Sequence, residues 1–218
     1  MPRRAVIFAD REDAGRRLAE RLAGYRSEDA VVLALPRGGV PVGYEVARVL
    51  RAPLDVFVAR KLGAPGQPEL AIGAVAPGGV RILHDRVVRE LGISENWIEA
   101  ATEKELAEVD RRMRRFRGER PEPEVGGRTV ILVDDGIATG MTVRAAIRAI
   151  REKAPRGIVL AVPVCAGVTA DALTAEVDEF ICLQTPADLW AIGFWYESFH
   201  QLEDEEVVEL LERGRLDD

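Results

Sequence analysis

The chain has 218 residues, of which 47% are hydrophobic and 31% are charged, a composition that is ordinary for a globular protein. Thirty Lys and Arg residues against 37 Asp and Glu residues give a formal net charge of −7, which excludes a generally basic nucleic-acid-binding chain. The longest mostly apolar run, residues 158–168, is too short for a membrane-spanning helix, which needs about 20 residues. We therefore expect neither nucleic acid nor membrane among its partners.

The N-terminus and the cysteines indicate the cellular compartment. Only residues 5–9 lie between the first arginines and Asp10, which is too short for the apolar core of a signal peptide. Cys165 and Cys182 each lie inside an apolar run, as is typical of buried cysteines in a reducing compartment, and so few cysteines exclude a disulfide scaffold. We expect a cytoplasmic protein.

Helical and strand-like patterns alternate along most of the chain. In chain order they predict a helix over 10–23, a strand over 31–35, a helix over 40–50, and strands over 55–59 and 130–133, then a helix over 143–153 and strands over 158–162 and 180–183. This alternation predicts an α/β fold, with a parallel, twisted, Rossmann-like sheet flanked by helices. Such sheets bind ligands beyond the carboxyl ends of their strands.

Two regions depart from the alternation. Residues 71–76 and 80–83 are strand-like runs separated by Pro-Gly-Gly, which predicts a hairpin. Residues 94–117 form a long helical pattern that is acidic at its start and basic at its end, as the helix macrodipole favours. From about residue 184 the chain is rich in aromatic and then in acidic residues, and it ends in a predicted helix over residues 203–213.

The most informative stretch is VILVDDGIATGMT, in which an apolar strand ends in Asp134 and Asp135 and a helix follows a short loop. The backbone N–H groups from Ile137 onward, with the hydroxyls of Thr139 and Thr142, can surround a phosphate at the helix N-terminus. The two acids can accept hydrogen bonds from sugar hydroxyls or hold Mg²⁺. Together these groups suit a ribose 5-phosphate. The alternative is a plain strand-to-helix turn with an acidic cap.

Cations follow two other predicted strands. The stretch LALPRGGVPVG places Arg37, Gly38 and Gly39 directly after the first strand. A cation followed by two glycines allows the backbone to approach a second anion closely, although many such tripeptides are plain turns. Arg60 and Lys61 close the second predicted strand, where a second anion site and a solvated strand end are both open.

The stretch VILVDDGIATGMT resembles the phosphoribosyl-pyrophosphate motif of the type I phosphoribosyltransferases, and the likeness extends over roughly residues 30–200. These enzymes use Mg²⁺ and displace pyrophosphate from the anomeric carbon of ribose with a nitrogen base. The resemblance implies that Asp134 and Asp135 bind the ribose hydroxyls and the metal. It implies a 5-phosphate loop made of Gly136, Ile137, Ala138, Thr139, Gly140, Met141 and Thr142.

The cations also have counterparts in this family. Arg37, Gly38 and Gly39 are similar to the family's pyrophosphate loop, in which a cis peptide is common. Arg60 and Lys61 stand where the family places cations that hold pyrophosphate. The resemblance therefore implies that Arg37 and Lys61 act in catalysis together with the two aspartates.

The stretch WAIGFWYE, residues 190–197, is similar to the hood of hypoxanthine-guanine phosphoribosyltransferases. By that likeness Trp190 stacks on the base and Glu197 lies near the metal or the edge of the base. Base stacking on an aromatic side chain contributes about 1–3 kcal/mol. The alternative is that the aromatic residues simply pack the C-terminal segment onto the sheet, a role that we expect in any case for Phe194, Trp195, Tyr196 and Phe199.

The sequence also departs from each branch of the family. Ala138 stands where the hypoxanthine-guanine branch has an aspartate that handles the proton of the base, and this loop is closer to the adenine branch. The Arg-Gly-Gly loop is more like the guanine-type enzymes, yet no lysine near Gln184 matches the one that reads a purine carbonyl. The stretch RKLGAPGQPELAIGAV resembles a group whose base is not assigned. We expect a purine-like acceptor without identifying it.

The helix over 94–117 occupies the slot of the family's mobile loop. Its basic end can meet pyrophosphate as part of a lid, or it can be a solvated helix end or a dimer contact. The cations in question are Arg111, Arg112, Arg114, Arg115 and Arg117. For His84 and His200 we expect surface or hydrogen-bonding roles rather than catalysis.

We therefore predict a single domain over residues 1–218, with a core of about 1–183 that includes an insertion over 71–120, and a hood over about 184–218. The predicted function is Mg²⁺-dependent pentosyl transfer from 5-phosphoribosyl 1-pyrophosphate to a nitrogenous base, and the resemblance implies a homodimer. The alternative is a non-catalytic sensor of the same compound or of a nucleotide. The cations for pyrophosphate favour the enzyme, since a monophosphate sensor has no pyrophosphate to hold.

Overall fold

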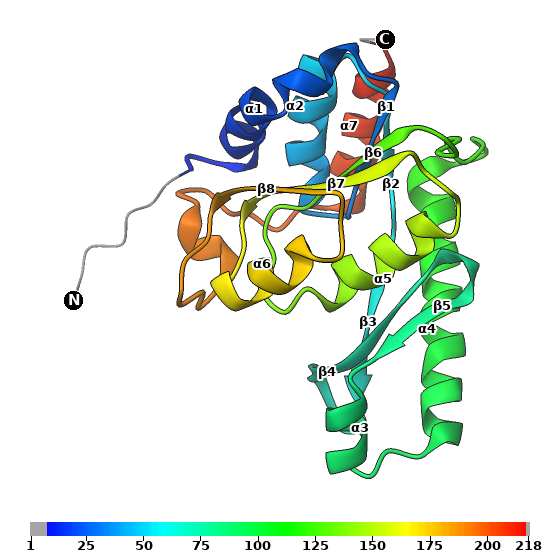
Figure 1. The fold of residues 1–218 in the computed structure, drawn as a ribbon. Coiled ribbons are helices and arrows are strands. Elements are labelled where there is room, and N and C mark those ends of the chain that lie inside the picture. Colours follow the sequence, from blue (N-terminus) through cyan, green and yellow to red (C-terminus); the bar gives the residue numbers. More distant parts are fainter. Residues whose placement is uncertain (1–7, 217–218) are drawn as a thin grey trace.

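A five-stranded parallel sheet forms the centre of the molecule, with the strand order β2-β1-β6-β7-β8 (Figure 1). The computed structural model describes residues 8–216, so part of the stretch considered as a signal peptide lies outside the described residues. The strands are β1 (Ala30–Ala34), β2 (Leu54–Val56), β6 (Thr129–Val133), β7 (Gly157–Val164) and β8 (Glu179–Gln184). The predicted α/β fold is confirmed.

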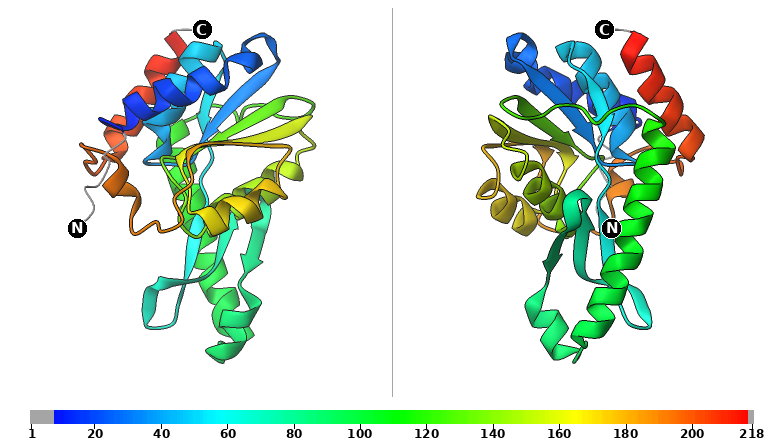
Figure 2. Two further views of the ribbon diagram at one scale, coloured as in Figure 1. Left: turned by 60° about the vertical axis from the view of Figure 1, so that its left-hand side comes forward. Right: turned by 90° about the vertical axis from the view of Figure 1, so that its right-hand side faces the viewer.

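Helices cover both faces of this sheet (Figure 2). One face carries α1 (Arg11–Arg21), α2 (Gly39–Leu50) and α7 (Asp204–Leu216). The other carries α5 (Met141–Arg151) and α6 (Gly167–Thr174). In β1, Val32 and Ala34 lie in the first core, whereas Val31 and Leu33 lie in the second. The strand is apolar throughout because alternate side chains are buried on opposite faces.

A second, antiparallel sheet of three strands extends from the central sheet, and we call it and α3 (Asp85–Glu90) the arm (Figure 2). Its strands are β3 (Arg60–Ala64), β4 (Gln67–Ala76) and β5 (Val80–Leu83). The pairing of β4 with β5 confirms the predicted hairpin.

The prediction of one strand over residues 55–59, closed by Arg60 and Lys61, is wrong. The strand β2 ends at Val56, and Arg60 and Lys61 begin β3, where Arg60 pairs with Val75 of β4. An apolar, β-branched run shows that a segment is extended, but it does not show which sheet the segment joins.

The predicted long helix is confirmed as α4 (Glu95–Arg117), which runs from the arm back to the central sheet (Figure 1). The Ser94 hydroxyl oxygen caps its start by accepting a hydrogen bond from the Trp97 N–H, and Gly118 at φ +65° ends it. Arg117 Nε lies 2.8 Å from Asp55 Oδ2, and both side chains are buried. Because of this contact, the end of the helix is anchored to β2 rather than solvated.

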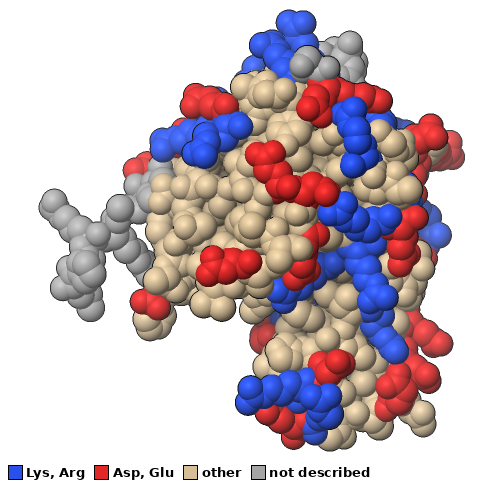
Figure 3. All heavy atoms as spheres, in the orientation of Figure 1, with Lys and Arg blue, Asp and Glu red and all other residues tan. Residues whose placement is uncertain are grey.

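Charges of both signs are interspersed along α4 and the arm on the face that Figure 3 shows, so no broad basic surface is seen there. Arg115 of α4 forms an ion pair with Glu205 of α7, which uses another of the predicted lid cations inside the molecule. Across residues 8–216 no helix combines the length and the apolar character needed to cross a membrane. The division of the chain near residue 184 into core and hood stays a prediction.

Candidate functional site

Two of the predicted loops meet where β1 and β6 end. The Leu35 N–H donates to the Val133 carbonyl oxygen at 2.8 Å, so the chains leaving the two strands run side by side. Residues 37–39, the RGG loop, follow β1, and Asp134 and Asp135, the acid pair, follow β6. The peptide bond between Pro36 and Arg37 is cis, as the family resemblance led us to expect. The carboxyl edge of the sheet therefore brings both motifs together, as parallel strands do.

The glycines of the RGG loop make this approach possible. A Cβ atom on Gly38 would lie 1.9 Å from Asp135 Oδ2, and one on Gly39 would lie 2.8 Å from the Val133 carbonyl oxygen. Any side chain at either position would overlap the acid pair or its backbone. Both positions therefore require glycine on steric grounds alone.

The acid pair is tied into the protein by groups from distant elements. Asp135 is buried, and its Oδ2 accepts a hydrogen bond from Arg11 Nε at 2.8 Å. The Tyr196 hydroxyl donates to the Asp135 carbonyl oxygen at 2.6 Å. Asp134 is partly exposed, and its Oδ1 accepts from the Asp135 N–H at 2.8 Å. Asp135 is thus held on both its side chain and its backbone, while Asp134 keeps an oxygen available to a ligand.

Burial governs the protonation of these acids. Desolvation raises the pKa of Asp134 well above its usual range, and the neighbouring Asp135 carboxylate raises it further. Desolvation also raises the pKa of Asp135, although the Arg11 guanidinium opposes that shift. Two adjacent buried carboxylates favour holding fewer than two negative charges. A ligand that brings hydroxyl donors or a cation therefore suits this position.

The predicted phosphate loop, residues 136–142, presents free backbone donors. Within residues 8–216 the N–H groups of Ala138, Thr139 and Gly140 have no hydrogen-bond acceptor, and Ala138 and Thr139 are exposed. Gly140, at φ +73°, turns the chain into α5, whose first-turn N–H groups have no partner within the helix. The Ile137 N–H instead donates to the Val164 carbonyl oxygen at 2.9 Å, so the prediction that it contacts a phosphate is wrong.

The other functional cations predicted from the sequence face acids rather than the acid pair. Arg60 Nε lies 2.9 Å from Glu105 Oε2 of α4, and Lys61 Nζ lies 3.0 Å from Glu69 Oε2 of β4.

Arg37 has weaker contacts with acids. Its Nη1 lies 3.8 Å from Glu203 Oε2 and 3.7 Å from Asp204 Oδ1, which is beyond hydrogen-bond distance. A polyanion would have to compete with these acids for Arg37.

The predicted hood residues divide into exposed and packed groups. Trp190 is 89% exposed, and Glu197 is exposed as well. Tyr196 is buried, with its ring 5.4 Å from the ring of Phe8, which is the packing role expected for it. A Cβ on Gly136 would lie 2.6 Å from Ile192 Cγ2, so the hood segment packs directly on the start of the phosphate loop. Trp190 does not pack the segment onto the sheet.

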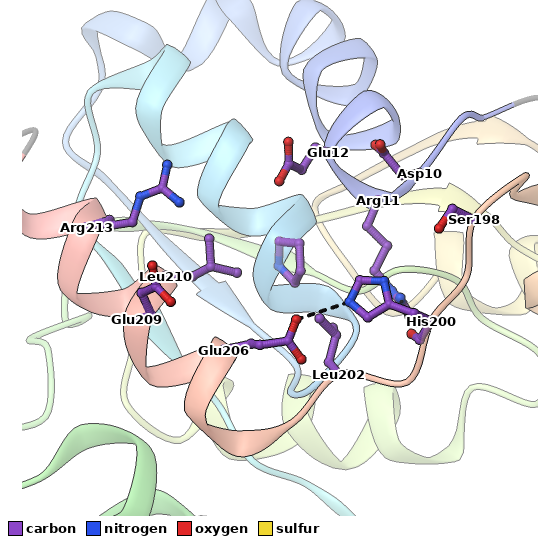
Figure 4. Close-up of a pocket in the computed structure, with 11 residues that line it drawn as sticks. Asp10, Arg11, Glu12, Ser198, His200, Leu202, Glu206, Glu209, Leu210 and Arg213 are labelled. Atoms are coloured by element: carbon purple, nitrogen blue, oxygen red, sulfur yellow. Dashed lines mark hydrogen bonds and ion pairs between the residues drawn. The ribbon is translucent and has the colours of Figure 1, made fainter.

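Arg11 was missed in the sequence analysis. It lies on the buried face of α1 together with Ala14 and Leu18, so a cation occupies an otherwise apolar stripe. That position was the available signal. In Figure 4, Arg11 forms part of the wall of a cavity of about 300 Å³ between α1, α2 and α7, and nearby His200 bonds Glu206.

The cysteines offer no nucleophile at neutral pH. Burial raises the pKa of Cys165 to about 12 and that of Cys182 to about 11, so both remain thiols. Cys165 is buried as predicted, whereas Cys182 is only partly so.

The acid pair is the candidate position for a divalent cation. No group of three or more His, Cys, Asp or Glu residues within the described part of the chain can form a complete metal cage. Mg²⁺ does not need one, because it is commonly held by one or two carboxylates together with water and substrate oxygens. Asp134 fits that requirement, whereas Asp135 is already paired with Arg11.

Comparisons with known proteins agree with this arrangement. The profile described as phosphoribosyl transferase domain matches residues 7–198. Two curated relatives from Mycobacterium tuberculosis, strains CDC 1551 / Oshkosh and ATCC 25618 / H37Rv, carry names that assign them provisionally to the phosphoribosyl transferases. They are 48% identical over 211 residues, which cover 97% of this chain and 48% of each relative. The chain therefore spans about half the length of these relatives. The crystal structure of TT1426 from Thermus thermophilus is 41% identical, with a TM-score of 0.81, covering 95% of this chain and 99% of that one.

Proposed function

The chain belongs to the phosphoribosyl transferase family, and on that premise we propose that it binds 5-phosphoribosyl 1-pyrophosphate and transfers the phosphoribosyl group to a nitrogenous base. The observation that carries the proposal is the meeting of the acid pair, the RGG loop and the phosphate loop at one edge of the sheet. A sugar with a phosphate at one end and a pyrophosphate at the other needs those three surfaces together.

Each surface has a distinct role in the proposed reaction. Asp134 and Asp135 accept hydrogen bonds from the ribose hydroxyls, and the free N–H groups from Ala138 onward donate to the 5-phosphate. Arg37 turns from its acids to the pyrophosphate. Mg²⁺, held by Asp134 and substrate oxygens, would supply positive charge to the departing group. The bond from the anomeric carbon to pyrophosphate breaks with its electron pair, a bond to the base nitrogen forms, and the base loses a proton.

The electrostatic part of this mechanism rests on the protein rather than on an acid or base in the loop. Position 138 is alanine, so no carboxylate there can take the proton of the base. Stabilisation of the departing pyrophosphate by fixed positive charge is then the main catalytic contribution of this chain.

For the acceptor we propose a flat, purine-like base stacked on Trp190. With 89% of its surface exposed, Trp190 contributes little to packing and has a free ring face. Replacing it by alanine is expected to raise KM for the base about tenfold or more, because a stacked base is worth about 1–3 kcal/mol. Steady-state kinetics would check this, with Leu91→Ala, an exposed apolar residue of the distant arm, as the control. An unchanged KM for the base would remove Trp190 from the site.

A direct assay tests the proposed function. The protein is incubated with 5-phosphoribosyl 1-pyrophosphate, Mg²⁺ and a panel of purines, pyrimidines and other ring nitrogen compounds, and pyrophosphate release is followed. We expect release that depends on one class of base and is lost in the double variant Asp134→Asn/Asp135→Asn. Tight binding without base-dependent release across the panel would contradict catalysis. Unchanged affinity in the double variant would contradict the placement of the ribose.

One observation favours a second candidate function, a non-catalytic sensor of the same compound. Lys61 and Arg60, which the sequence assigned to pyrophosphate, are both occupied by carboxylates within hydrogen-bond distance. A protein that only senses the ribose phosphate does not need them. Tight binding together with the absence of release in the assay would support this function.

A further inference from the structure

Arg11 stands where helix stability alone would not place a cation. It is the first residue of α1, directly after the N-cap Asp10, whose side chain accepts a hydrogen bond from the Asp13 N–H. The N-terminus of a helix carries partial positive charge, so an arginine there is unfavourable and an acid is favoured. Arg11 is also only 8% exposed, and burying a cation costs free energy unless it is paired. Its position therefore needs another explanation.

The contacts of Arg11 supply that explanation. Its Nε donates to Asp135 Oδ2 at 2.8 Å, its Nη1 donates to the His200 carbonyl oxygen at 2.9 Å, and its guanidinium carbon lies 3.8 Å from the centre of the Phe199 ring. Directed donors on two sides and an aromatic face on a third fix the guanidinium in one orientation. Arg11 therefore holds the Asp135 carboxylate in one place as well.

The backbone around Arg11 is equally constrained. A Cβ atom on Gly15, one turn further along α1, would lie 2.8 Å from the Val42 carbonyl oxygen of α2. The two helices therefore cross in close contact, which sets the position of Arg11 relative to the RGG loop just before α2. Asp135 Oδ2 in turn faces Gly38, with no room between them for a methyl group.

Charge gives the arrangement its consequence for a phosphorylated ligand. Two ionised carboxylates side by side would repel the phosphates that the neighbouring loops present donors for. Arg11 neutralises one of the two, and it does so from the protein side, so it takes no space from a ligand.

We propose that Arg11 is a positioning residue of the candidate site: it fixes and neutralises Asp135, so that this carboxylate accepts from a ribose hydroxyl while Asp134 is left for a cation. This inference rests on the proposed function. Arg11 touches neither ligand nor reacting atoms and acts only through Asp135. A ligand that lacks the sugar, such as inorganic phosphate, should therefore be indifferent to Arg11.

Titration calorimetry with two probes tests this role. Arg11→Met is expected to weaken ribose 5-phosphate binding about tenfold or more, since a charge-assisted hydrogen bond is worth about 1.5–3 kcal/mol, and to change inorganic phosphate affinity less than about twofold. The control is Arg16→Met, an exposed arginine of the same helix, which should behave as the wild type. If Arg11→Met does not fold, Arg11→Lys serves, because lysine keeps the charge but cannot donate to both partners in the same geometry.

The double variant Arg11→Met/Asp135→Asn separates positioning from a general structural role. If Arg11 acts through Asp135, the double variant should bind ribose 5-phosphate within about twofold of Asp135→Asn alone. Wild-type ribose 5-phosphate affinity in Arg11→Met, an equal loss for inorganic phosphate, or multiplied losses in the double variant would each overturn the role. A wild-type protein that binds no ribose 5-phosphate would instead overturn the proposed function itself.

Discussion

Gly38→Ala is expected to weaken the binding of ribose 5-phosphate about ten- to a hundred-fold while leaving the sheet folded. The new methyl group would lie 1.9 Å from Asp135 Oδ2, so the carboxylate must move. Moving it breaks the hydrogen bond from Arg11, a charge-assisted bond of about 1.5–3 kcal/mol. The backbone of Gly38, at φ −62°, is open to any residue, so the effect is steric and local.

Calorimetry of ligand binding and thermal unfolding of the same samples would check this prediction. Gly24→Ala is the matched control, because no atom lies within 4 Å of the position its Cβ would take. Gly39→Ala should be worse for stability, since its methyl group would meet main-chain atoms of Val133 and Asp134 that cannot rotate away. Wild-type affinity in Gly38→Ala would mean that the Asp135 carboxylate is free to move and is not a fixed part of the site.

Arg117→Met is expected to lower the free energy of unfolding by about 3–5 kcal/mol, because it leaves the Asp55 carboxylate buried without its cation. The two groups are 2.8 Å apart, and Arg117 Nη2 also donates to the Val56 carbonyl oxygen at 3.4 Å. This contact joins the end of α4 to β2, the edge strand of the central sheet. Its loss should loosen α4 from the central sheet.

Urea unfolding would measure the effect. Arg111→Met, an exposed arginine of the same helix paired with Glu108, is the control and should change stability little. In Arg117→Met/Asp55→Asn the buried charge is removed with its partner, so the loss should be smaller than the sum of the two single losses. A loss below about 1 kcal/mol in Arg117→Met would show that water reaches Asp55 and that the pair is not an anchor.

Local patterns in the chain predicted the features that depend on neighbours in sequence. Five apolar runs marked the central strands, although the run over residues 55–59 continues past the end of β2. The acid pair and the phosphate loop lie within one strand-loop-helix unit, so their proximity follows from chain connectivity. The RGG loop could be placed beside them because parallel strands carry their ligand-binding loops at one edge.

The tertiary structure decided which distant charges meet. Arg11 and Asp135 are 124 residues apart, and Arg117 and Asp55 are 62 apart. No periodicity marks such a pair, because an ion pair depends on where two side chains point after the sheet and helices have packed. A cation on an apolar helix face was the single hint for Arg11.

The same reason explains why Arg60 and Lys61 were placed wrongly. Their extended backbone was predictable, but their membership of the arm depends on pairing with β4, and their partners Glu105 and Glu69 come from other elements. By itself the sequence therefore determined the α/β layers and the motif for a ribose phosphate. Only the packed structure decided which cations are committed to acids and which acid of the pair is neutralised, since those outcomes depend on burial and direction rather than on composition.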